Sequence, residues 1–149
     1  MLTTPTHLRD KLCELDNDLG GLPGRRVALL GFRDPNAKRV DDNLRALRET
    51  PQWTVVDHRN VSEAGLSKVL DAPKLAMVLD ANDPVPTDAS LLIRALHDSH
   101  KAVRWRDGTG SALPSDRKLY IVAVGARSVD ELPALLQRID FMTFIRPPA

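Results

Sequence analysis

Short continuous runs of hydrophobic residues alternate along this chain with stretches of helical spacing. Continuous runs at residues 27–30, 75–79 and 119–124 are typical of strands that are covered on both faces. Two further runs, at residues 53–56 and 102–105, are rich in β-forming residues. The pattern therefore predicts five strands separated by helices.

Helix starts are indicated where a capping residue precedes leucines or valines spaced by three and four residues. The expected caps are Thr6, Asp34, Ser62, and Ser128 of a capping box that ends at Glu131. The helix after the third strand is expected from about residue 87 to residue 99. A last helix is expected to bury Leu132, Leu135, Leu136 and Ile139. The residues from 141 onward are expected to form a tail.

Strands that alternate with helices imply right-handed crossovers and helices on both faces of a parallel sheet. The predicted fold class is therefore α/β: a three-layer sandwich with a five-stranded mostly parallel sheet, flavodoxin-like or Rossmann-like, plus an extra N-terminal helix. The expected division is a helix and linker over residues 1–24, the α/β domain over 25–141 and a tail over 142–149. The leucine stripe of the first helix could pack on this domain or on a second copy in a homodimer. Its members are Leu8, Leu12, Leu15 and Leu19.

Composition narrows the classes of function. The 149 residues carry a formal net charge of +1 and 4% aromatic residues, which disfavours nucleic acid as a partner. No apolar run approaches the ~20 residues of a membrane span, and no secretory signal precedes the first helix. We therefore expect no membrane partner and a cytoplasmic location. The single cysteine, Cys13, excludes an internal disulfide.

Ligands of doubly wound sheets bind beyond the carboxyl ends of the strands, which directs attention to three loops. The first contains Asp80, Asp83 and Asp88, after the clearest strand. Carboxylates there can accept hydrogen bonds from sugar hydroxyls, hold Mg²⁺, or act as base or nucleophile. Aspartate is also an ordinary residue of turns and helix caps, so a purely structural role stays open.

The second candidate is the segment Gly31, Phe32, Arg33 and Asp34, after the first strand. Glycine lets a ligand approach the backbone closely. Arg33 could bind phosphate, and the amides at the helix start near Asp34 could receive an anion. The alternative is that the arginine is only solvated and the aspartate only caps a helix.

The third candidate is the loop that contains Arg106, Asp107, Gly108 and Thr109. Its guanidinium, flexible backbone and hydroxyl suit a phosphate or a ribose, although turn residues are also common in surface loops. The chain has no G-x-G-x-x-G fingerprint, no P-loop and no zinc-ligand spacing. We therefore expect no cofactor and no metal site.

Three segments carry a resemblance to a known group of enzymes. They are Val27-Ala28-Leu29-Leu30-Gly31-Phe32, Leu79-Asp80-Ala81-Asn82-Asp83-Pro84, and Lys101-Ala102-Val103-Arg104-Trp105-Arg106-Asp107. Over residues 27–141 the chain resembles the nucleoside 2-deoxyribosyltransferase-like group, which includes nucleotide N-glycosidases and is related in architecture to bacterial TIR-like domains. The resemblance implies a nucleoside or nucleotide ligand and cleavage of an N-glycosidic bond.

The resemblance also implies roles for particular residues. Members of the group usually carry a glutamate on the helix after the third strand, and the best-matching position here is Leu92. Asp88, one helical turn earlier, is then the residue that could act as acid, base or nucleophile. Asp80 would hold the ribose hydroxyls, so Asp80 and Asp88 are the catalytic candidates.

A weaker resemblance is to response-regulator receiver domains, because Asp80 ends the third strand and Pro84 follows four residues later. The acidic pair of that family falls at Phe32 and Arg33 here, and its lysine is missing after the fifth strand. This resemblance implies the alternative function: a non-catalytic, pseudo-receiver-like domain for signalling or protein interaction, with the first helix as a dimer surface.

Overall fold

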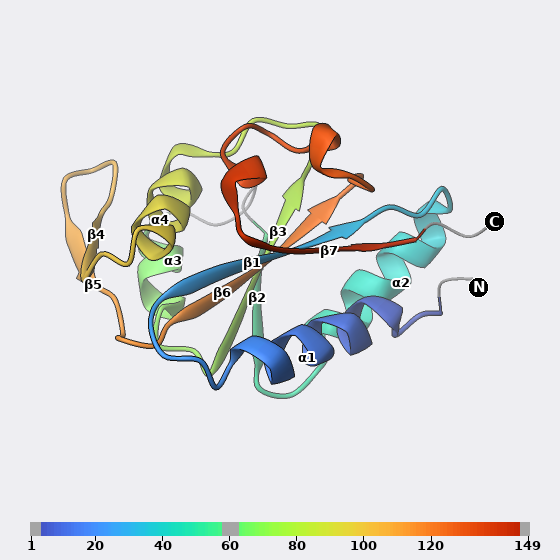
Figure 1. Ribbon diagram of the computed structural model, residues 1–149, viewed down its shortest axis with the longest axis horizontal. Helices are drawn as coiled ribbons and strands as arrows, with labels where there is room; N and C mark the ends of the chain where they lie inside the picture. Colours follow the sequence, from blue (N-terminus) through green and yellow to red (C-terminus); the bar gives the residue numbers. More distant parts are fainter. Residues whose placement is uncertain (1–3, 58–62, 147–149) are drawn as a thin grey trace.

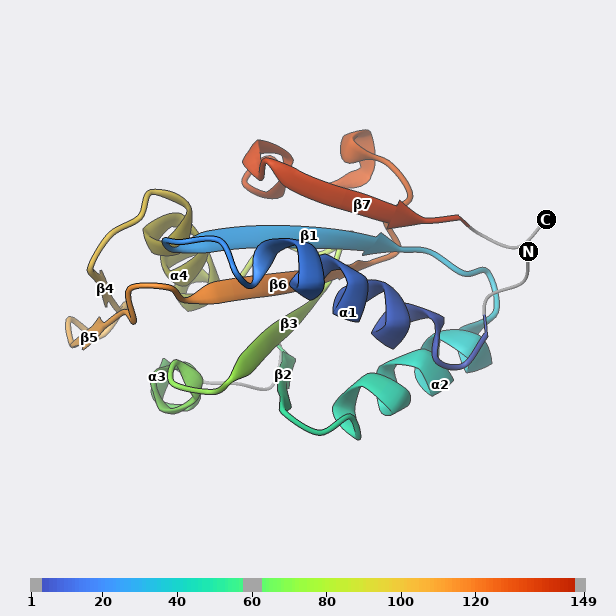
Figure 2. The same cartoon turned by 60° about the horizontal axis from the view of Figure 1, so that its bottom comes forward.

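Five parallel strands form the central sheet of the computed structural model, which describes residues 4–57 and 63–146 (Figure 1). The strands are β1 (Arg26–Phe32), β2 (Trp53–Asp57), β3 (Lys74–Asp80), β6 (Lys118–Val124) and β7 (Phe141–Ile145). They lie in the order β2-β3-β6-β1-β7, and every neighbouring pair is parallel. Figure 2 shows the strands stacked in this order, with β7 at one end. The predicted α/β fold class is confirmed.

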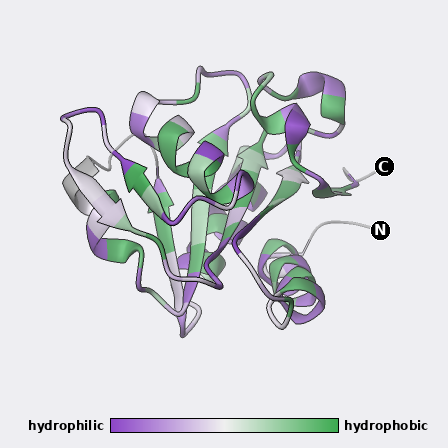
Figure 3. Cartoon of the chain, turned by 60° about the vertical axis from the view of Figure 1, so that its left-hand side comes forward, coloured by the Kyte–Doolittle hydropathy of each residue, from purple (hydrophilic) through white to green (hydrophobic). Residues whose placement is uncertain are grey.

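Helices cover both faces of the sheet. α1 (His7–Leu19) and α2 (Ala37–Arg48) lie on one face, and α3 (Glu63–Val69) and α4 (Thr87–His97) lie on the other (Figure 1). Figure 3 shows hydrophobic residues on the inner sides of the layers and hydrophilic residues on the outer sides. No helix in the described part of the chain is long and apolar enough to cross a membrane.

The leucines of α1 pack on the sheet of their own domain. Leu8 and Leu12 are fully buried, and Leu19 is nearly so, in a core that also contains Leu30 and Phe32 of β1. Burial of one such side chain contributes about 1.5–3 kcal/mol. The leucine stripe was expected to pack either on its own domain or on a second copy. In the structure it packs on its own domain.

One expected helix cap is wrong, and another, Thr6, occupies the N-cap position of α1 without a side-chain hydrogen bond to the helix. α2 is capped by Asn36, whose side chain accepts a hydrogen bond from an amide of the first helical turn, and not by Asp34. The hydroxyl of Thr6 donates to the carboxylate of Asp10 instead of bonding to a helix amide. The third expected cap, Ser62, lies outside the described residues.

Residues 102–105, expected as a strand of the sheet, belong to a separate hairpin. β4 (Ala102–Arg104) pairs antiparallel with β5 (Gly110–Ala112), and neither strand joins the central sheet. Gly108 has a φ of +91° in the connecting turn, and an Asp-Gly pair is a strong hairpin signal. The first and last residues of β4 are exposed, whereas an inner parallel strand needs apolar residues on both faces.

The last predicted helix is replaced by two 3₁₀ turns, η1 (Val129–Glu131) and η2 (Leu136–Arg138). Pro133 explains the difference, because it lacks an amide donor and favours extended backbone at Leu132, which has φ −92° and ψ 148°. The expected tail is also wrong for residues 141–145. They form β7, which pairs with β1 at the edge of the sheet.

Two cations are buried at the amino ends of the strands. The ammonium of Lys118 donates to the carbonyl oxygens of Leu22, Gly24 and Asp116 at 2.7, 2.8 and 3.0 Å. The neighbouring Arg117 donates to carbonyls of the turn before β3. Burial lowers the pKa of both groups, because a low-dielectric environment disfavours the charged form. These cations join three loops to the start of β6.

Candidate functional site

The carboxyl ends of β1, β6 and β3 lie side by side and are joined by backbone hydrogen bonds. Val124 of β6 stands opposite both Phe32 of β1 and Asp80 of β3. Beyond these pairs, the N–H of Gly125 donates to the carbonyl of Phe32 (2.8 Å), and the N–H of Ala81 donates to the carbonyl of Val124 (2.9 Å). The loops that follow these three strands therefore share one edge of the sheet, which we call the carboxyl edge.

Gly125 shapes the middle of the carboxyl edge. Its φ of +93° lies in the left-handed region that favours glycine. A Cβ at this position would lie 3.2 Å from Nδ2 of Asn82, in the loop after β3. Any larger residue would therefore need both strained backbone and a displacement of Asn82. Sequence reasoning did not include Gly125 or Asn82 among the site residues, although a glycine directly after a buried strand is a usable signal.

Two arginines hold one carboxylate at the carboxyl edge. Nη1 of Arg33 lies 2.9 Å from Oε1 of Glu131, and Nε of Arg127 lies 3.2 Å from the same oxygen. The backbone N–H of Arg127 donates to Oε2 at 2.9 Å. This amide hydrogen bond, together with the charges of both guanidiniums, holds the pKa of Glu131 below its usual range. The edge is thus arranged to hold an anionic oxygen group.

Sequence reasoning missed Arg127 of this arrangement and also Glu131. Glu131 was expected to close a capping box with Ser128, but the Ser128 side chain caps no helix. Its carboxylate reaches instead to Arg33, 98 residues away in the chain. No local spacing can indicate such a pair.

Phe144 of β7 fills the space beside Gly31. A Cβ at Gly31 would lie 2.1 Å from Cδ1 of Phe144 and 2.9 Å from the carbonyl oxygen of Ala126. Phe32 is fully buried in the core on the α1 side of the sheet. The structure therefore gives both Gly31 and Phe32 packing roles, and the glycine permits the close approach of β7.

Asp34 forms a buried ion pair with Arg39. Nε of Arg39 lies 3.1 and 2.9 Å from the two carboxylate oxygens, and the carboxylate is 0% exposed. Asp34 also accepts a hydrogen bond from the N–H of Asn36. The carboxylate of Asp34 therefore lies at the start of α2, where the sequence suggested that an external anion could bind.

The three aspartates after β3 have different surroundings. Oδ1 of Asp80 accepts the N–H of Asn82 at 2.9 Å, in the turn at the carboxyl edge. Oδ1 of Asp88 accepts the N–H of Arg106 at 2.9 Å and thereby ties α4 to the hairpin. Asp83 is exposed. Each of Asp80 and Asp88 thus accepts one backbone amide, but Asp80 lies at the carboxyl edge and Asp88 lies between α4 and the hairpin.

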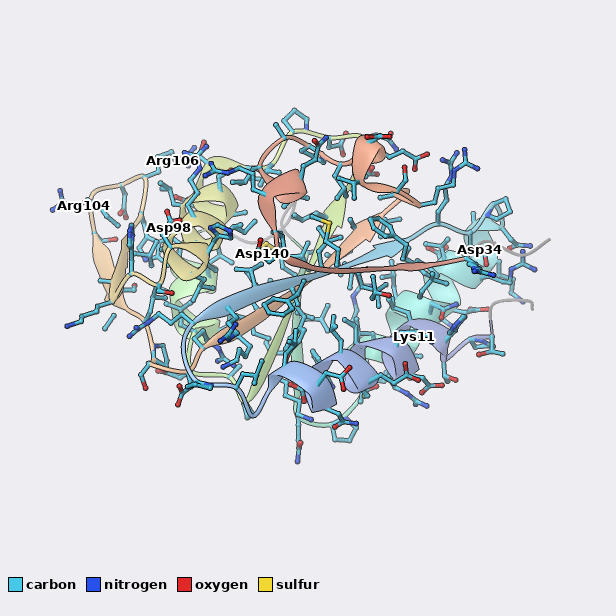
Figure 4. All side chains as sticks on the ribbon, in the orientation of Figure 1. Lys11, Asp34, Asp98, Arg104, Arg106 and Asp140 are labelled. Carbon is cyan, nitrogen blue, oxygen red and sulfur yellow. The ribbon has the colours of Figure 1, made fainter. Side chains whose placement is uncertain are left out.

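The hairpin loop bonds largely to itself. Oδ1 of Asp107 accepts both the N–H (2.8 Å) and the hydroxyl (2.6 Å) of Thr109. Figure 4 shows Arg106, on the hairpin, and Asp34 at opposite ends of the molecule. The structure therefore does not bring the second and third candidate loops together around one phosphate.

A cavity of about 340 Å³ lies away from the carboxyl edge, between α4 and η2. His97 borders it, with Nδ1 at 3.1 Å from the Asp98 carboxylate and Nε2 at 3.2 Å from the carbonyl of Arg138. The hydrogen bond from His97 lowers the pKa of Asp98. Among residues 4–57 and 63–146, no group of three or more His, Cys, Asp and Glu side chains is arranged to hold a metal ion.

No family model matches the chain, and no curated protein matches it. Among solved structures, the chain is similar to the RuvB Holliday junction branch migration motor of Thermotoga maritima, with 14% sequence identity and a TM-score of 0.47. The match covers 93% of this chain and 44% of that one, so this chain spans less than half the length of that protein. Evidence about function therefore comes from the site.

Proposed function

We propose that this chain is a non-catalytic binding domain that takes a phosphate-bearing nucleoside at the carboxyl edge of its sheet. The observation that carries the proposal is the convergence of Arg33, Arg127 and one backbone amide on the carboxylate of Glu131. Guanidiniums and amides that hold a carboxylate are also the groups that hold a phosphate. A phosphate would therefore take the place of the Glu131 carboxylate.

Asp80 supplies the second part of the proposed site. It ends β3, and β6 separates β3 from β1 in the sheet. Because neighbouring strands lie about 4.8 Å apart, the loops that carry Asp80 and Arg33 start about 10 Å apart. One nucleotide can span that distance, with its ribose hydroxyls donating to Asp80 and its phosphate on Arg33 and Arg127. Asn82 and Gly125 lie between these two ends.

The proposal includes no bond cleavage. A general acid, base or nucleophile must reach the reacting atoms of the substrate. Asp88 accepts the amide of Arg106, and Leu92, at the position of the deoxyribosyltransferase glutamate, is fully buried. The resemblance to the deoxyribosyltransferase-like group therefore enters the proposal only through the class of ligand.

A thermal-shift panel of nucleoside monophosphates, deoxynucleosides, NAD and inorganic phosphate tests this function. A ligand at about 100 times its Kd adds about 2.7 kcal/mol, which raises Tm by several degrees. We expect nucleoside monophosphates to give such a shift and Arg33→Ala or Arg127→Ala to abolish it. Glu131→Gln should strengthen binding, because it removes the competing negative charge. Arg104→Ala, on the exposed hairpin, is the matched control and should keep the shift.

Two results would contradict the proposal. One is the absence of a shift with every compound in the panel. The other is a shift that Arg106→Ala abolishes and Arg33→Ala leaves intact, because it would locate the phosphate on the hairpin. Asp80→Asn separates the two parts of the site, since it should weaken binding of nucleoside monophosphates more than that of inorganic phosphate.

A second candidate is the pseudo-receiver-like interaction domain that works without a ligand. It is favoured by the internal hydrogen bonds of Asp34, Asp88 and Asp107, which occupy most of the predicted carboxylates. Phe32 is fully buried, and so is Ala126, in the loop after β6 where the receiver lysine would lie. Acetyl phosphate with Mg²⁺ should therefore leave the mass of the protein unchanged, and addition of one phosphoryl group would refute this candidate.

A further inference from the structure

β7 leaves one edge of the sheet open. It is the last strand in the sheet order, and within the described residues it pairs with β1 alone. Figure 1 shows β7 in front of β1 with no other element before it, and Figure 2 shows it at the end of the stack of strands. An exposed edge is a template for pairing with another strand. The sequence of β7, Phe-Met-Thr-Phe-Ile, contains no charge or proline that would prevent such pairing.

The residues of β7 and its two flanks are self-complementary. Two copies that pair antiparallel about Thr143 bring that residue opposite its own counterpart. In this register the other opposed pairs are Phe141 with Ile145, Met142 with Phe144, and Asp140 with Arg146. Apolar pairs, Thr–Thr pairs and pairs of opposite charge are all favourable across antiparallel strands. The pairing therefore has an apolar centre and an ion pair at each end.

The two faces of the sheet also agree in this register. Met142 and Phe144 pack against the core on the α4 side, whereas Phe141 and Ile145 belong to the core on the α1 side. Directly opposite residues of an antiparallel pair point to the same face. Each opposed pair therefore continues the core to which both of its members already belong, and a shift by one residue would destroy this match.

The other edge strand, β2, lacks this property. Antiparallel pairing about its central residue, Val55, would place Trp53 opposite Asp57 and Thr54 opposite Val56. An aromatic ring opposite a carboxylate forms neither an apolar pair nor an ion pair. Self-complementarity is therefore a feature of β7 and not of every edge in this sheet.

We propose that two copies of this chain associate by antiparallel pairing of β7 about Thr143, which joins the two five-stranded sheets into one. The two-fold axis makes every contact twice, as in other isologous interfaces. A joined sheet of this size lies within the range of open sheets, which reaches about 10 strands. The proposal does not depend on a ligand at the carboxyl edge.

Light scattering of the full chain at increasing concentration, up to the millimolar range, is the first test. The mass should rise from 16.5 kDa toward twice that value. Asp140→Arg places two arginines opposite each other at both ends of the pairing, and Arg146→Asp places two aspartates there. Each change should weaken association about tenfold. The combined exchange, Asp140→Arg with Arg146→Asp, should restore it, and Arg104→Asp on the hairpin should have no effect.

Cross-linking tests the register directly. In a Cys13→Ser background, Thr143→Cys should give a disulfide-linked dimer on oxidation, because the two cysteines face each other across the two-fold axis. Met142→Cys should not, because its counterpart is offset along the strand. A chain that stays monomeric at every concentration overturns the proposal and leaves the edge to a different partner. The proposal is also overturned by a dimer that Asp140→Arg or Arg146→Asp does not weaken, or that the combined exchange does not restore.

Discussion

Replacement of Gly31 by alanine tests whether this glycine serves packing or the approach of a ligand. The new Cβ would lie 2.1 and 2.5 Å from two ring carbons of Phe144. An ordinary contact between carbon atoms is about 3.5–4.0 Å. The carbonyl oxygen of Ala126 lies 2.9 Å from the same position, so the new Cβ cannot shift toward that side to avoid the ring. The Phe144 ring, and with it part of β7, must therefore move.

We expect Gly31→Ala to lower the free energy of unfolding by about 1–3 kcal/mol, the usual range for an overpacked buried site. At about 2–4 °C per kcal/mol for a chain of this size, Tm should fall by roughly 2–12 °C. Denaturant unfolding followed by circular dichroism measures the change. Gly110→Ala is the matched control, because the nearest atom to a Cβ at that position lies 3.7 Å away.

A double-mutant cycle shows whether the clash with Phe144 is the cause. Phe144→Ala alone should also destabilise the fold, because it removes a packed ring. The double variant should lose less stability than the sum of the two single variants, by about 1 kcal/mol or more. The reasoning fails if Gly31→Ala leaves stability unchanged or if the two effects are additive, since the glycine would then face free space.

Three further predictions concern stability. Ser99 follows α4 with a left-handed φ of +58°, so Ser99→Gly should raise the free energy of unfolding by about 0.5–1 kcal/mol, measured by urea titration. Lys118→Met removes the donor of three carbonyls on exposed or half-buried residues and should cost about 0.5–1.5 kcal/mol, whereas Lys118→Arg should recover part of the loss. The lowered pKa of Glu131 means that its stabilising effect is complete at neutral pH and is lost as acid protonates the carboxylate. Glu131→Gln should therefore be less stable than the natural chain at pH 7, and in paired thermal melts the difference should shrink as the pH falls through the lowered pKa and vanish only below it; a difference that does not shrink in acid would contradict this.

Elements that are buried on both faces could be predicted from the sequence. β1, β3 and β6 are continuous apolar runs, and their side chains fill the cores on both sides of the sheet. The errors occur where one residue outweighs the pattern. Pro133 breaks a helix that the spacing of leucines favours, and Gly108 turns a short β run back on itself. In both cases the backbone restriction of one residue decides the local structure.

The candidate site could be predicted only in its location. The sequence places Asp80 and Arg33 at strand ends, and the structure brings these strand ends to one edge. The sequence cannot indicate that Arg33 pairs with the carboxylate of Glu131, because only the folded sheet brings these two residues together. It also cannot separate a glycine that faces a ligand from one that faces a ring, as at Gly31, because β7 was not expected.

The position of β1 in the sheet has a consequence for how the chain acquires its structure. β1 comes early in the sequence, yet both of its neighbours, β6 and β7, come late. During synthesis, β1 therefore has no native partner strand until residues 118–124 have been made, and its second edge stays open until residues 141–145 follow. Sheets with such distant pairings close slowly, and their unpaired strands are prone to aggregate in the meantime. Fragments that end before β6 should therefore need a chaperone to stay soluble.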